Sequence, residues 1–198
     1  MSEGGRPPSC PPRRGSPRSR AIATRVLALF GWRVAGPFPT APRAVVIVAP
    51  HTSNWDFPVS MTAMLALGLR IDFFAKHSLF FFPARYVLRW LGAKPVDRQV
   101  RSGTVRHSIE RLASEPELYV GIAPEGTRKR VEAWKTGFWQ VADGAGVPII
   151  PVALDWGRRE LRIMDAVETT GDQAADIAAI QKMFQPEMAR RPENFAGA

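Results

Sequence analysis

The amino-acid sequence predicts a single-domain α/β sandwich, with a largely parallel central sheet flanked by helices. Three observations support this fold class. The chain has 198 residues, enough for one hydrophobic core of ordinary size and too few for two. Short runs rich in Val and Ile have the composition of buried strands. Stretches with apolar residues at helical spacing separate these runs, and strands that alternate with helices pair in parallel.

The expected elements follow from these patterns in chain order. Buried strands are expected at residues 44–49, 71–75, 118–123, 147–154 and 161–164. Helices are expected at residues 59–67, 83–91 and 104–113, around 138–142, and at 172–184. The last helix has Ile177, Ile180 and Phe184 on one face and ends before Pro186, because proline cannot continue a helix.

The N-terminal region divides into two segments ahead of the main domain, which we place at residues 37–198. Residues 1–20 are rich in Pro and Arg and carry almost no large apolar side chains, so we expect a disordered basic tail. Residues 21–36 place Ile22 and Leu29 at near-helical spacing, which predicts a short amphipathic helix. Its apolar face either packs on the domain or lies in a membrane interface.

The charge and the cysteine count limit the possible partners and compartments. The formal net charge of +9, from 27 Lys and Arg against 18 Asp and Glu, favours an anionic partner: nucleic acid, a phosphorylated metabolite or a lipid headgroup. The single cysteine, Cys10, excludes an intramolecular disulfide and a cysteine-based zinc site, and it fits a reducing location. No apolar run reaches the roughly 18 to 20 residues of a bilayer-spanning helix. Arg25 argues against a secretory signal.

The strongest indication of chemistry is the segment 51–56, His-Thr-Ser-Asn-Trp-Asp, which follows the strand at 44–49. Active-site residues of open α/β sheets lie beyond the carboxyl ends of strands. On one turn, Asp56 can hold one ring nitrogen of His51 and leave the other free to accept a proton, as in a hydroxyl-activating site. Taken singly, such an aspartate is more often a helix N-cap, and a lone histidine is more often structural.

A second polar cluster, residues 124–130, follows the strand at 118–123 in the same topological position. Two such clusters at two strand ends should converge on one cleft. Gly126 lets the backbone approach a ligand closely, and the guanidinium group of Arg128 suits a phosphate. A solvated basic turn would explain the other cations of this cluster, but it would leave Glu125 unexplained.

Two further features lie between these clusters. Arg98 follows an extended stretch restricted by Pro95, and as a third wall of the cleft it would bind an anion. Aromatic residues with Arg85 and Arg89 among them either form a membrane-touching face or, as is commoner, pack in the core. These aromatic residues are Phe80, Phe81, Phe82, Tyr86 and Trp90.

The order and spacing of these blocks resemble the glycerolipid acyltransferase superfamily, above all the bacterial 1-acylglycerol-3-phosphate acyltransferases. The first block is His51 and Asp56, separated by four residues. The others are 94–98 (Lys-Pro-Val-Asp-Arg), 124–128 (Pro-Glu-Gly-Thr-Arg) and 147–151 (Val-Pro-Ile-Ile-Pro). The match covers roughly residues 45–154, and four ordered blocks are far more specific than a lone histidine and aspartate.

The resemblance implies transfer of a fatty acyl group from acyl-coenzyme A or acyl carrier protein to the hydroxyl of a lysophospholipid-type acceptor such as 1-acylglycerol-3-phosphate. His51, oriented by Asp56, would be the base. The implied substrate-binding residues are Lys76, Arg98, Glu125, Gly126, Thr127 and Arg128, with Pro148 at the acyl pocket. We expect no metal and no cofactor beyond the thioester co-substrate. The sequence contains no Gly-x-Ser-x-Gly elbow of the kind that forms an acyl-enzyme.

Two departures from the family pattern bear on the substrate and on the membrane. Ala123 stands where the family usually has an aromatic residue, and one short amphipathic segment replaces the longer N-terminal anchor of many members. The expected placement is peripheral, on the cytoplasmic face of the cell membrane and in contact with anionic lipid. One alternative is a protein of the same fold that binds an anionic lipid or nucleotide without chemistry. A nucleic-acid-binding protein is disfavoured, because no nucleic-acid module is recognisable and part of the excess charge lies in the tail.

Overall fold

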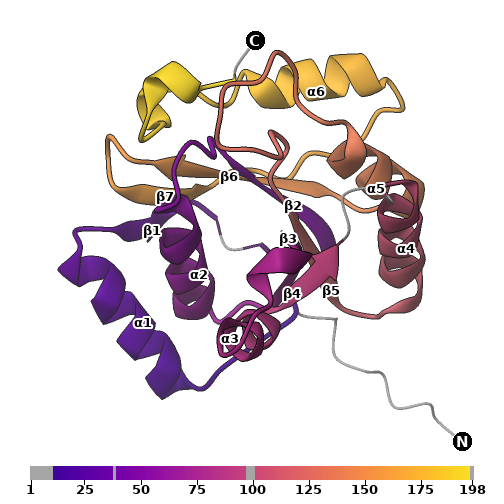
Figure 1. The fold of residues 1–198 in the computed structure, drawn as a ribbon. Coiled ribbons are helices and arrows are strands. Elements are labelled where there is room, and N and C mark those ends of the chain that lie inside the picture. The colour runs from indigo at the N-terminus through magenta and orange to yellow at the C-terminus, as the bar shows by residue number, and fades with distance from the viewer. Residues whose placement is uncertain (1–10, 38, 97–100, 197–198) are drawn as a thin grey trace, which may run out of the picture.

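A seven-stranded sheet forms the centre of the protein, in the order β1-β7-β6-β2-β5-β3-β4 (Figure 1). The computed structural model describes residues 11–37, 39–96 and 101–196. Neighbouring strands are parallel except for the antiparallel pair β6 and β7, which confirms the predicted largely parallel sheet. The strands are β1 (Arg33–Ala35), β2 (Arg43–Ala49), β3 (Ile71–Lys76), β4 (Ala93–Val96), β5 (Leu118–Ile122), β6 (Ile149–Asp155) and β7 (Glu160–Ile163).

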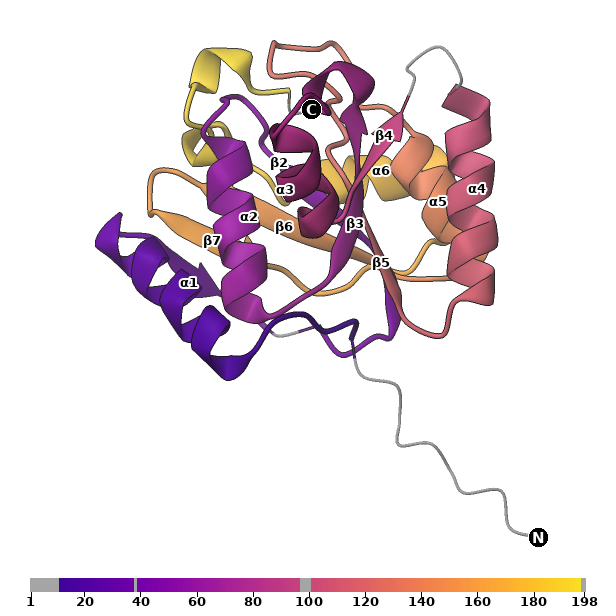
Figure 2. The same cartoon turned by 60° about the horizontal axis from the view of Figure 1, so that its bottom comes forward.

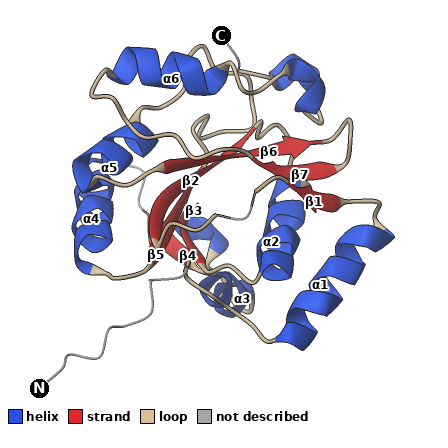
Figure 3. Cartoon of the chain, turned by 180° about the vertical axis from the view of Figure 1, so that it is seen from behind, coloured by secondary structure: helices blue, strands red, loops and turns tan. Residues whose placement is uncertain are grey.

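Helices cover both faces of the sheet, as the sandwich prediction requires. Helices α1, α2 and α3 lie on one face, and α4, α5 and α6 lie on the other (Figure 3). The helices are α1 (Pro17–Leu29), α2 (Asp56–Leu67), α3 (Ala84–Leu91), α4 (Arg101–Ser114), α5 (Gly137–Ala145) and α6 (Gln173–Gln181). Short 3-10 turns occur at η1 (His77–Leu79), η2 (Pro186–Met188) and η3 (Pro192–Asn194).

Each face of the sheet has its own hydrophobic core. In β2, Val45 and Ile47 belong to the core under α4, α5 and α6, whereas Ala44 and Val46 belong to the core under α1, α2 and α3. Every residue of β6 is buried, which is the pattern of a strand covered on both sides. Burial on both faces explains why the central strands can be recognised in the sequence as uninterrupted apolar runs.

The five strands expected from the sequence are present, with ends that differ by one or two residues. The sequence does not predict β1 and β4, the strands at the two edges of the sheet. β1 has only three residues, and β4 contains Pro95, which is tolerated at an edge because one side of the strand needs no partner. Short, partly polar edge strands leave no continuous apolar run to recognise.

The N-terminal region is more ordered than the sequence predicts. Helix α1 begins at Pro17, inside the segment expected to be a disordered tail. Ser16 and Ser19 form a capping box, in which the Ser16 Oγ accepts from the Ser19 backbone N–H at 3.2 Å and the Ser19 Oγ accepts from the Ser16 backbone N–H at 2.9 Å. Ahead of the helix, the backbone N–H of Arg14 donates to the carbonyl of Gly68 at 2.8 Å. The prediction of a disordered tail is therefore wrong for the residues from Pro17 onward. Composition could not reveal this, because the order comes from hydrogen bonds of the backbone and of two serines.

The amphipathic helix expected at residues 21–36 lies closer to the N-terminus and ends at Leu29. Ala23 and Leu27 are buried, whereas Ile22 and Leu29 are exposed. The helix therefore packs on the domain and still presents apolar side chains outward. Within the described ranges, no helix is long and apolar enough to cross a bilayer. Residues 1–10, which include Cys10, lie outside the described residues.

The loops after β2 and β5 start from neighbouring strands and diverge. β2 and β5 pair in parallel, with Ile47 beside Ile122, so the residues after these strands meet at one edge of the sheet. The first loop leads to α2 on one face, and the second leads to α5 on the other (Figure 2). A crevice forms where connections diverge in this way, and it is the usual ligand site of an open α/β sheet.

Candidate active site

His51 and Asp56 lie together beyond the carboxyl end of β2. Asp56 is the first residue of α2, and its Oδ2 lies 3.6 Å from the Nδ1 of His51. This distance is longer than a hydrogen bond, and such catalytic contacts often tighten only when substrate binds. The other ring nitrogen, Nε2, is left for a substrate hydroxyl. The two side chains thus lie as the sequence pattern predicts, with the aspartate beside one nitrogen of the ring.

Asp56 is fully buried, and its carboxylate accepts hydrogen bonds from different parts of the chain. The backbone N–H of Ser53 donates to its Oδ2 at 2.6 Å, and the indole N–H of Trp156 donates to its Oδ1 at 2.9 Å. Burial raises the pKa of Asp56, while these hydrogen bonds and the charge of Arg128 oppose the rise. The N-cap alternative fails, because the capping position of α2 is Trp55 and no side chain caps this helix.

The imidazole of His51 is kept neutral by its surroundings. Burial, and after it the charge of Arg128, lowers the pKa of His51 to about 4. The side chain is 18% exposed and lines the cavity described below. At neutral pH the ring is therefore uncharged and can accept a proton, as a general base must.

Glu125 supports the His51 loop from the neighbouring strand. Its Oε2 accepts a hydrogen bond from the backbone N–H of His51 at 2.7 Å, and the residue is 2% exposed. Burial raises the pKa of Glu125 to about 7, and the nearby charge of Asp56 adds to the rise. The resemblance implies that Glu125 binds substrate. The structure instead joins its carboxyl group to the His51 backbone, and Glu125 is not among the residues that line the cavity.

Gly126, Thr127 and Arg128 form part of the cavity wall. Gly126 has φ of +64°, a left-handed conformation that favours glycine, and an added Cβ would overlap the Nζ of Lys135. Glycine therefore makes room for Lys135, a cation that the sequence analysis did not single out. Together with Lys76 at the end of β3, Arg128 and Lys135 bring three positive charges to the cavity wall, which suits a phosphate group.

A cavity of about 1830 Å³ opens beside His51. Most of its wall is apolar and comes from α2, α3 and the sheet, with further residues from α4 and α5. Val48 of β2, Met64 of α2 and Leu88 of α3 are examples. A wall that is mostly apolar and carries some polar and charged side chains fits an amphiphile with a hydrocarbon chain. Among residues 11–37, 39–96 and 101–196, no group of three or more His, Cys, Asp or Glu side chains could hold a metal ion.

The remaining expected substrate-binding residues have different outcomes. Lys76 is exposed and lines the cavity. Pro148 directly precedes β6, which runs parallel to β2, so it lies at the opposite edge of the sheet from the catalytic loops and does not line the cavity. Its expected place at the acyl pocket is therefore wrong, although Ile150 and Val152 of the same block do line the cavity. Arg98 lies outside the described residues.

The aromatic residues of the segment 80–90, which runs from the loop after β3 into α3, are largely exposed. Phe81, Phe82, Tyr86 and Trp90 each expose 57% or more of their surface, while Phe80 is half-buried. Packing in the core is therefore the wrong explanation for four of these five aromatic residues. An exposed apolar surface of this kind marks a site of interaction.

Trp156 is a site residue that the sequence does not predict, and it contacts Asp56 from a position 100 residues away in the chain. No spacing rule connects residues so far apart. The only available signal was its place directly after the predicted strand at 147–154, because side chains at strand ends often reach a site.

Comparisons with known proteins place the chain in a family. The Acyltransferase family matches residues 33–155, which is more than half of the chain. The 1-acyl-sn-glycerol-3-phosphate acyltransferase of Haemophilus influenzae is 29% identical over 197 residues, which cover 87% of this chain and 81% of that protein. The enzyme of the same name from Escherichia coli is 30% identical over 140 residues, which cover 66% of this chain and 56% of that protein. The match thus spans about half of the length of the Escherichia coli relative.

A solved structure shares the fold. The crystal structure of the 1-acyl-sn-glycerophosphate acyltransferase from Thermotoga maritima superposes with a TM-score of 0.56 and covers 84% of this chain and 78% of that one. At 22% identity, this likeness shows the fold alone. The resemblance inferred from the four sequence blocks is confirmed by the match over residues 33–155. The chain belongs to the acyltransferase family.

Proposed function

We propose that this protein transfers a fatty acyl group from a thioester to the free hydroxyl of a lysophospholipid, with His51 as general base. The observation that carries the proposal is one juxtaposition. A neutral, partly buried imidazole, paired with Asp56 and close to Arg128, opens onto a large apolar cavity. The family membership supports the reaction class, and the names of the relatives support a 1-acyl-sn-glycerol-3-phosphate acceptor.

The geometry supports a single-step transfer. The Nε2 atom of His51 takes the proton of the acceptor hydroxyl while the oxygen attacks the thioester carbonyl. The new carbon–oxygen bond forms, the carbon–sulfur bond breaks, and the departing thiolate takes up the proton from His51. Asp56 stabilises the transient imidazolium by its charge beside Nδ1. The products are a doubly acylated lipid and a free thiol, and no acyl-enzyme forms.

The cations and the apolar part of the cavity wall support one orientation of the acceptor. Arg128, Lys135 and Lys76 would bind its phosphate, because a phosphate accepts hydrogen bonds from guanidinium and ammonium groups. Arg98 remains a predicted partner for the same phosphate. The apolar wall along α2 and α3 accommodates hydrocarbon. The thiol carrier is either coenzyme A or acyl carrier protein, and the assay below distinguishes the two.

A protein of the same fold that only binds an anionic lipid would not require the arrangement around His51. A binding site needs cations and an apolar wall, but it has no use for an imidazole held neutral beside a fully buried carboxylate. We therefore favour catalysis over binding alone.

Product analysis tests the proposal. The full chain is mixed with hexadecanoyl-coenzyme A or hexadecanoyl acyl carrier protein and with 1-acylglycerol-3-phosphate, glycerol-3-phosphate or 1-acylglycerol, and the products are identified by mass spectrometry. The expected result is a doubly acylated phosphate-bearing lipid and an equal amount of free thiol with one or both donors. Binding of the acceptor without any thiol release would establish the binding-protein alternative instead.

We further propose that the protein reaches its substrates from the cytoplasmic face of the membrane, through the exposed apolar surface around α3. This α3 surface consists of Leu79, Phe81, Phe82, Tyr86, Val87 and Trp90. Arg85 and Arg89 lie among these residues and would attract anionic headgroups. Leu79, Phe81 and Val87 also line the cavity, so a hydrocarbon chain could pass from the bilayer to the cavity along apolar side chains.

Vesicle binding tests the α3 surface. The full chain should co-sediment with vesicles that contain phosphatidylglycerol and less with pure phosphatidylcholine vesicles. The double substitution Phe82→Ser and Tyr86→Ser removes two contacting aromatic rings that do not line the cavity, so it should weaken sedimentation severalfold. The matched pair Leu29→Ser and Phe30→Ser tests the C-terminal end of α1, because both of these apolar side chains are exposed there. If only the α1 pair weakened binding, the contact would belong to α1.

A further inference from the structure

We propose that Trp156 is a positioning residue for the reaction, which holds the carboxylate of Asp56 in the orientation that pairs with His51. This inference rests on the proposed function. Trp156 is the residue directly after the part of the chain that matches the family, residues 33–155. It belongs to none of the four sequence blocks that imply chemistry.

The two oxygens of Asp56 have separate donors, and the difference fixes the plane of the carboxylate. The indole N–H of Trp156 binds Oδ1 at 2.9 Å, while the backbone N–H of Ser53 binds Oδ2 at 2.6 Å. Oδ2 is the oxygen that faces Nδ1 of His51 at 3.6 Å. Asp56 is 0% exposed, so a lost donor leaves a buried carboxylate oxygen without its hydrogen bond, which is costly. Without this donor, the carboxylate could turn about its Cβ–Cγ bond and lose its alignment with the imidazole.

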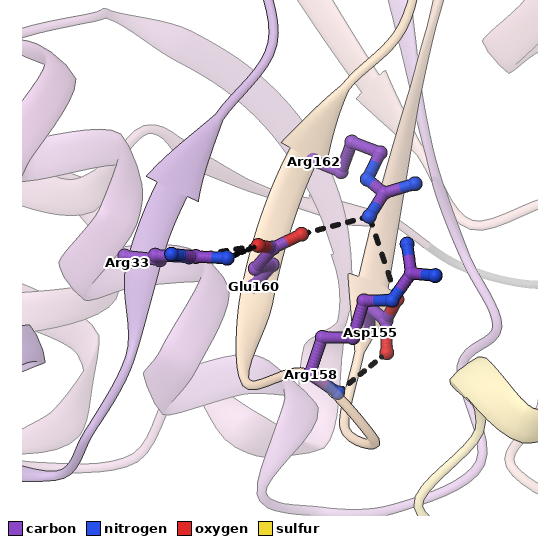
Figure 4. Close-up of polar contacts among 5 residues, drawn as sticks. All are labelled: Arg33, Asp155, Arg158, Glu160 and Arg162. Carbon is purple, nitrogen blue, oxygen red and sulfur yellow. Dashed lines mark hydrogen bonds and ion pairs between the residues drawn. The ribbon is translucent and has the colours of Figure 1, made fainter.

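Trp156 lies in a turn that is itself held by a hydrogen bond and an ion pair. It opens the turn between β6 and β7, where the Oδ1 of Asp155 accepts from the backbone N–H of Arg158 at 2.8 Å and the Oδ2 lies 4.0 Å from the guanidinium of Arg162 (Figure 4). Next to this turn, Glu160 of β7 connects β7 to the edge strand β1, because it pairs with Arg33 of β1 and with Arg162 of β7 (Figure 4).

The C-terminal segment closes over Trp156 from the other side. The backbone N–H of Trp156 donates to the carbonyl of Met188 at 2.9 Å, and the guanidinium of Arg190 lies 4.5 Å from the centre of an indole ring, over its face. The backbone N–H of Arg191 donates to the Oγ1 of Thr52 at 3.2 Å. The segment after α6 is thus bonded both to Trp156 and to the loop that carries His51. None of these bonds joins the segment after α6 to a residue that lines the cavity. Through Trp156, the segment can still affect the position of Asp56 and so the reaction.

A second indole in the same protein provides a matched control. The indole N–H of Trp139 donates to the Oδ2 of Asp176 at 2.8 Å, which is the same chemical contact at nearly the same distance. Asp176 accepts two further bonds from Thr170 and belongs to α6, on the opposite face of the sheet from α2. Trp139 does not line the cavity. If an indole–carboxylate bond has only a structural role, its loss should change the activity equally at Trp139 and at Trp156. If Trp156 positions Asp56, only its loss should lower the activity.

The test compares Trp156→Phe with Trp139→Phe in the full chain. Each substitution removes one N–H donor and keeps an aromatic ring. We expect Trp156→Phe to lower kcat/KM about tenfold to a hundredfold through kcat, because small displacements of a catalytic group have effects of this size. The acceptor KM should stay nearly constant, and Trp139→Phe should keep the activity of the unmodified protein. Equal activities of the two variants would overturn the proposal.

A double-mutant cycle distinguishes positioning from general loosening. If Trp156 acts through Asp56, the substitution Trp156→Phe should lower kcat by less than about twofold in an Asp56→Ala background, because the effects of coupled residues do not multiply. If both substitutions multiplied their full effects, Trp156 would act independently of Asp56 and the proposal would fail.

A spectroscopic measurement keeps the proposal testable if Trp156→Phe does not fold, or if no acyl transfer is found. In the NMR spectrum of the unmodified protein, the assigned indole N–H resonance of Trp156 should shift in Asp56→Ala, whereas that of Trp139 should not. An unmoved Trp156 resonance would overturn the inference. A moved resonance without any acyl transfer would support the contact and would count against the proposed function alone.

Discussion

At the scale of single residues, burial shifts the pKa values of two neighbouring groups, His51 and Glu125, in opposite directions. It lowers the pKa of His51 to about 4 and raises the pKa of Glu125 to about 7. Burial always disfavours the charged form, which is protonated for histidine and ionised for glutamate. Around neutral pH the site therefore contains an imidazole ready to accept a proton, and Glu125 is close to its own titration.

Arg128 should contribute to the acid limit of activity. Burial and, after it, the charge of Arg128 lower the pKa of His51, so Arg128→Ala should raise that pKa, and His51 would then become protonated at a higher pH. Because the neutral ring is the active form, the acid limb of the kcat/KM profile should move to higher pH. Arg128→Lys keeps the charge and should move it less. Unchanged limbs in both variants, measured over the full pH range, would show that His51 does not define the limb.

Glu125 should make the free energy of unfolding fall as the pH rises. Its pKa is raised from 4.5 to about 7 in the folded protein, so the folded state binds this proton more tightly than the unfolded state does. The contribution to stability is complete below pH 4.5 and is lost as the pH rises through about 7. Glu125→Gln should therefore gain stability relative to the unmodified protein over this window, by up to about 3 kcal/mol.

Denaturant unfolding of both proteins at several pH values checks this effect. A constant difference in stability between pH 4.5 and 8 would contradict the raised pKa of Glu125.

The sequence predicts site residues well where they lie on one short loop. His51 and Asp56 are five positions apart, and Arg128 follows the neighbouring strand, so pattern and topology place them together. Prediction from the sequence fails where the placement of a site residue depends on contacts between distant parts of the chain. The partner of the Glu125 carboxyl group is a backbone N–H, and Trp156 reaches Asp56 from another strand. Neither contact leaves a trace in local spacing.

At the scale of elements, helix α2 forms one long wall of the cavity. Phe57, Met61, Met64 and Leu67 line the cavity at helical spacing, starting next to the catalytic loop. The ten residue steps from the first of these to the last span about 15 Å, at 1.5 Å per residue. The apolar space thus extends along most of the helix, away from His51.

A bulky side chain on this wall should shorten the acyl chain that the protein accepts. Met64→Trp fills part of the space about two turns along α2, and misfit in an apolar pocket costs about 1–3 kcal/mol. The ratio of kcat/KM for hexadecanoyl to octanoyl donors should fall about tenfold or more. Met64→Leu conserves volume and should keep the ratio, and the octanoyl donor reports whether the fold is intact. An unchanged ratio in Met64→Trp would mean that the transferred chain lies elsewhere.

Elements buried on both faces are those that the sequence predicts best. β2 and β6 are nearly continuous apolar runs because both faces are covered. β1 and β4 lie at the edges, and α1 starts in a segment rich in proline and arginine, so their sequences carry a weaker signal. A capping box of two serines and backbone bonds to the end of α2 stabilise the start of α1, and composition cannot reveal them.

At the scale of the whole molecule, the order of the strands accounts for the site. β2 lies between β5 and β6, so the loop with His51 and the loop with Arg128 begin side by side although 77 positions separate the two residues. The helices that follow these loops cover opposite faces, which opens the crevice. The C-terminal segment then returns to the same edge and contacts Thr52 and Trp156.

The most direct test of the account is the rate of acyl transfer in His51→Ala, with His107→Ala as its control. His107 is exposed on α4 and does not line the cavity. With both variants folded and both substrates saturating, His51→Ala should lose about a hundredfold to ten-thousandfold in kcat, the range expected for a lost general base. His107→Ala should match the unmodified protein. A His51→Ala variant that transfers acyl groups at the full rate would contradict the assignment of the base, and with it the proposed mechanism.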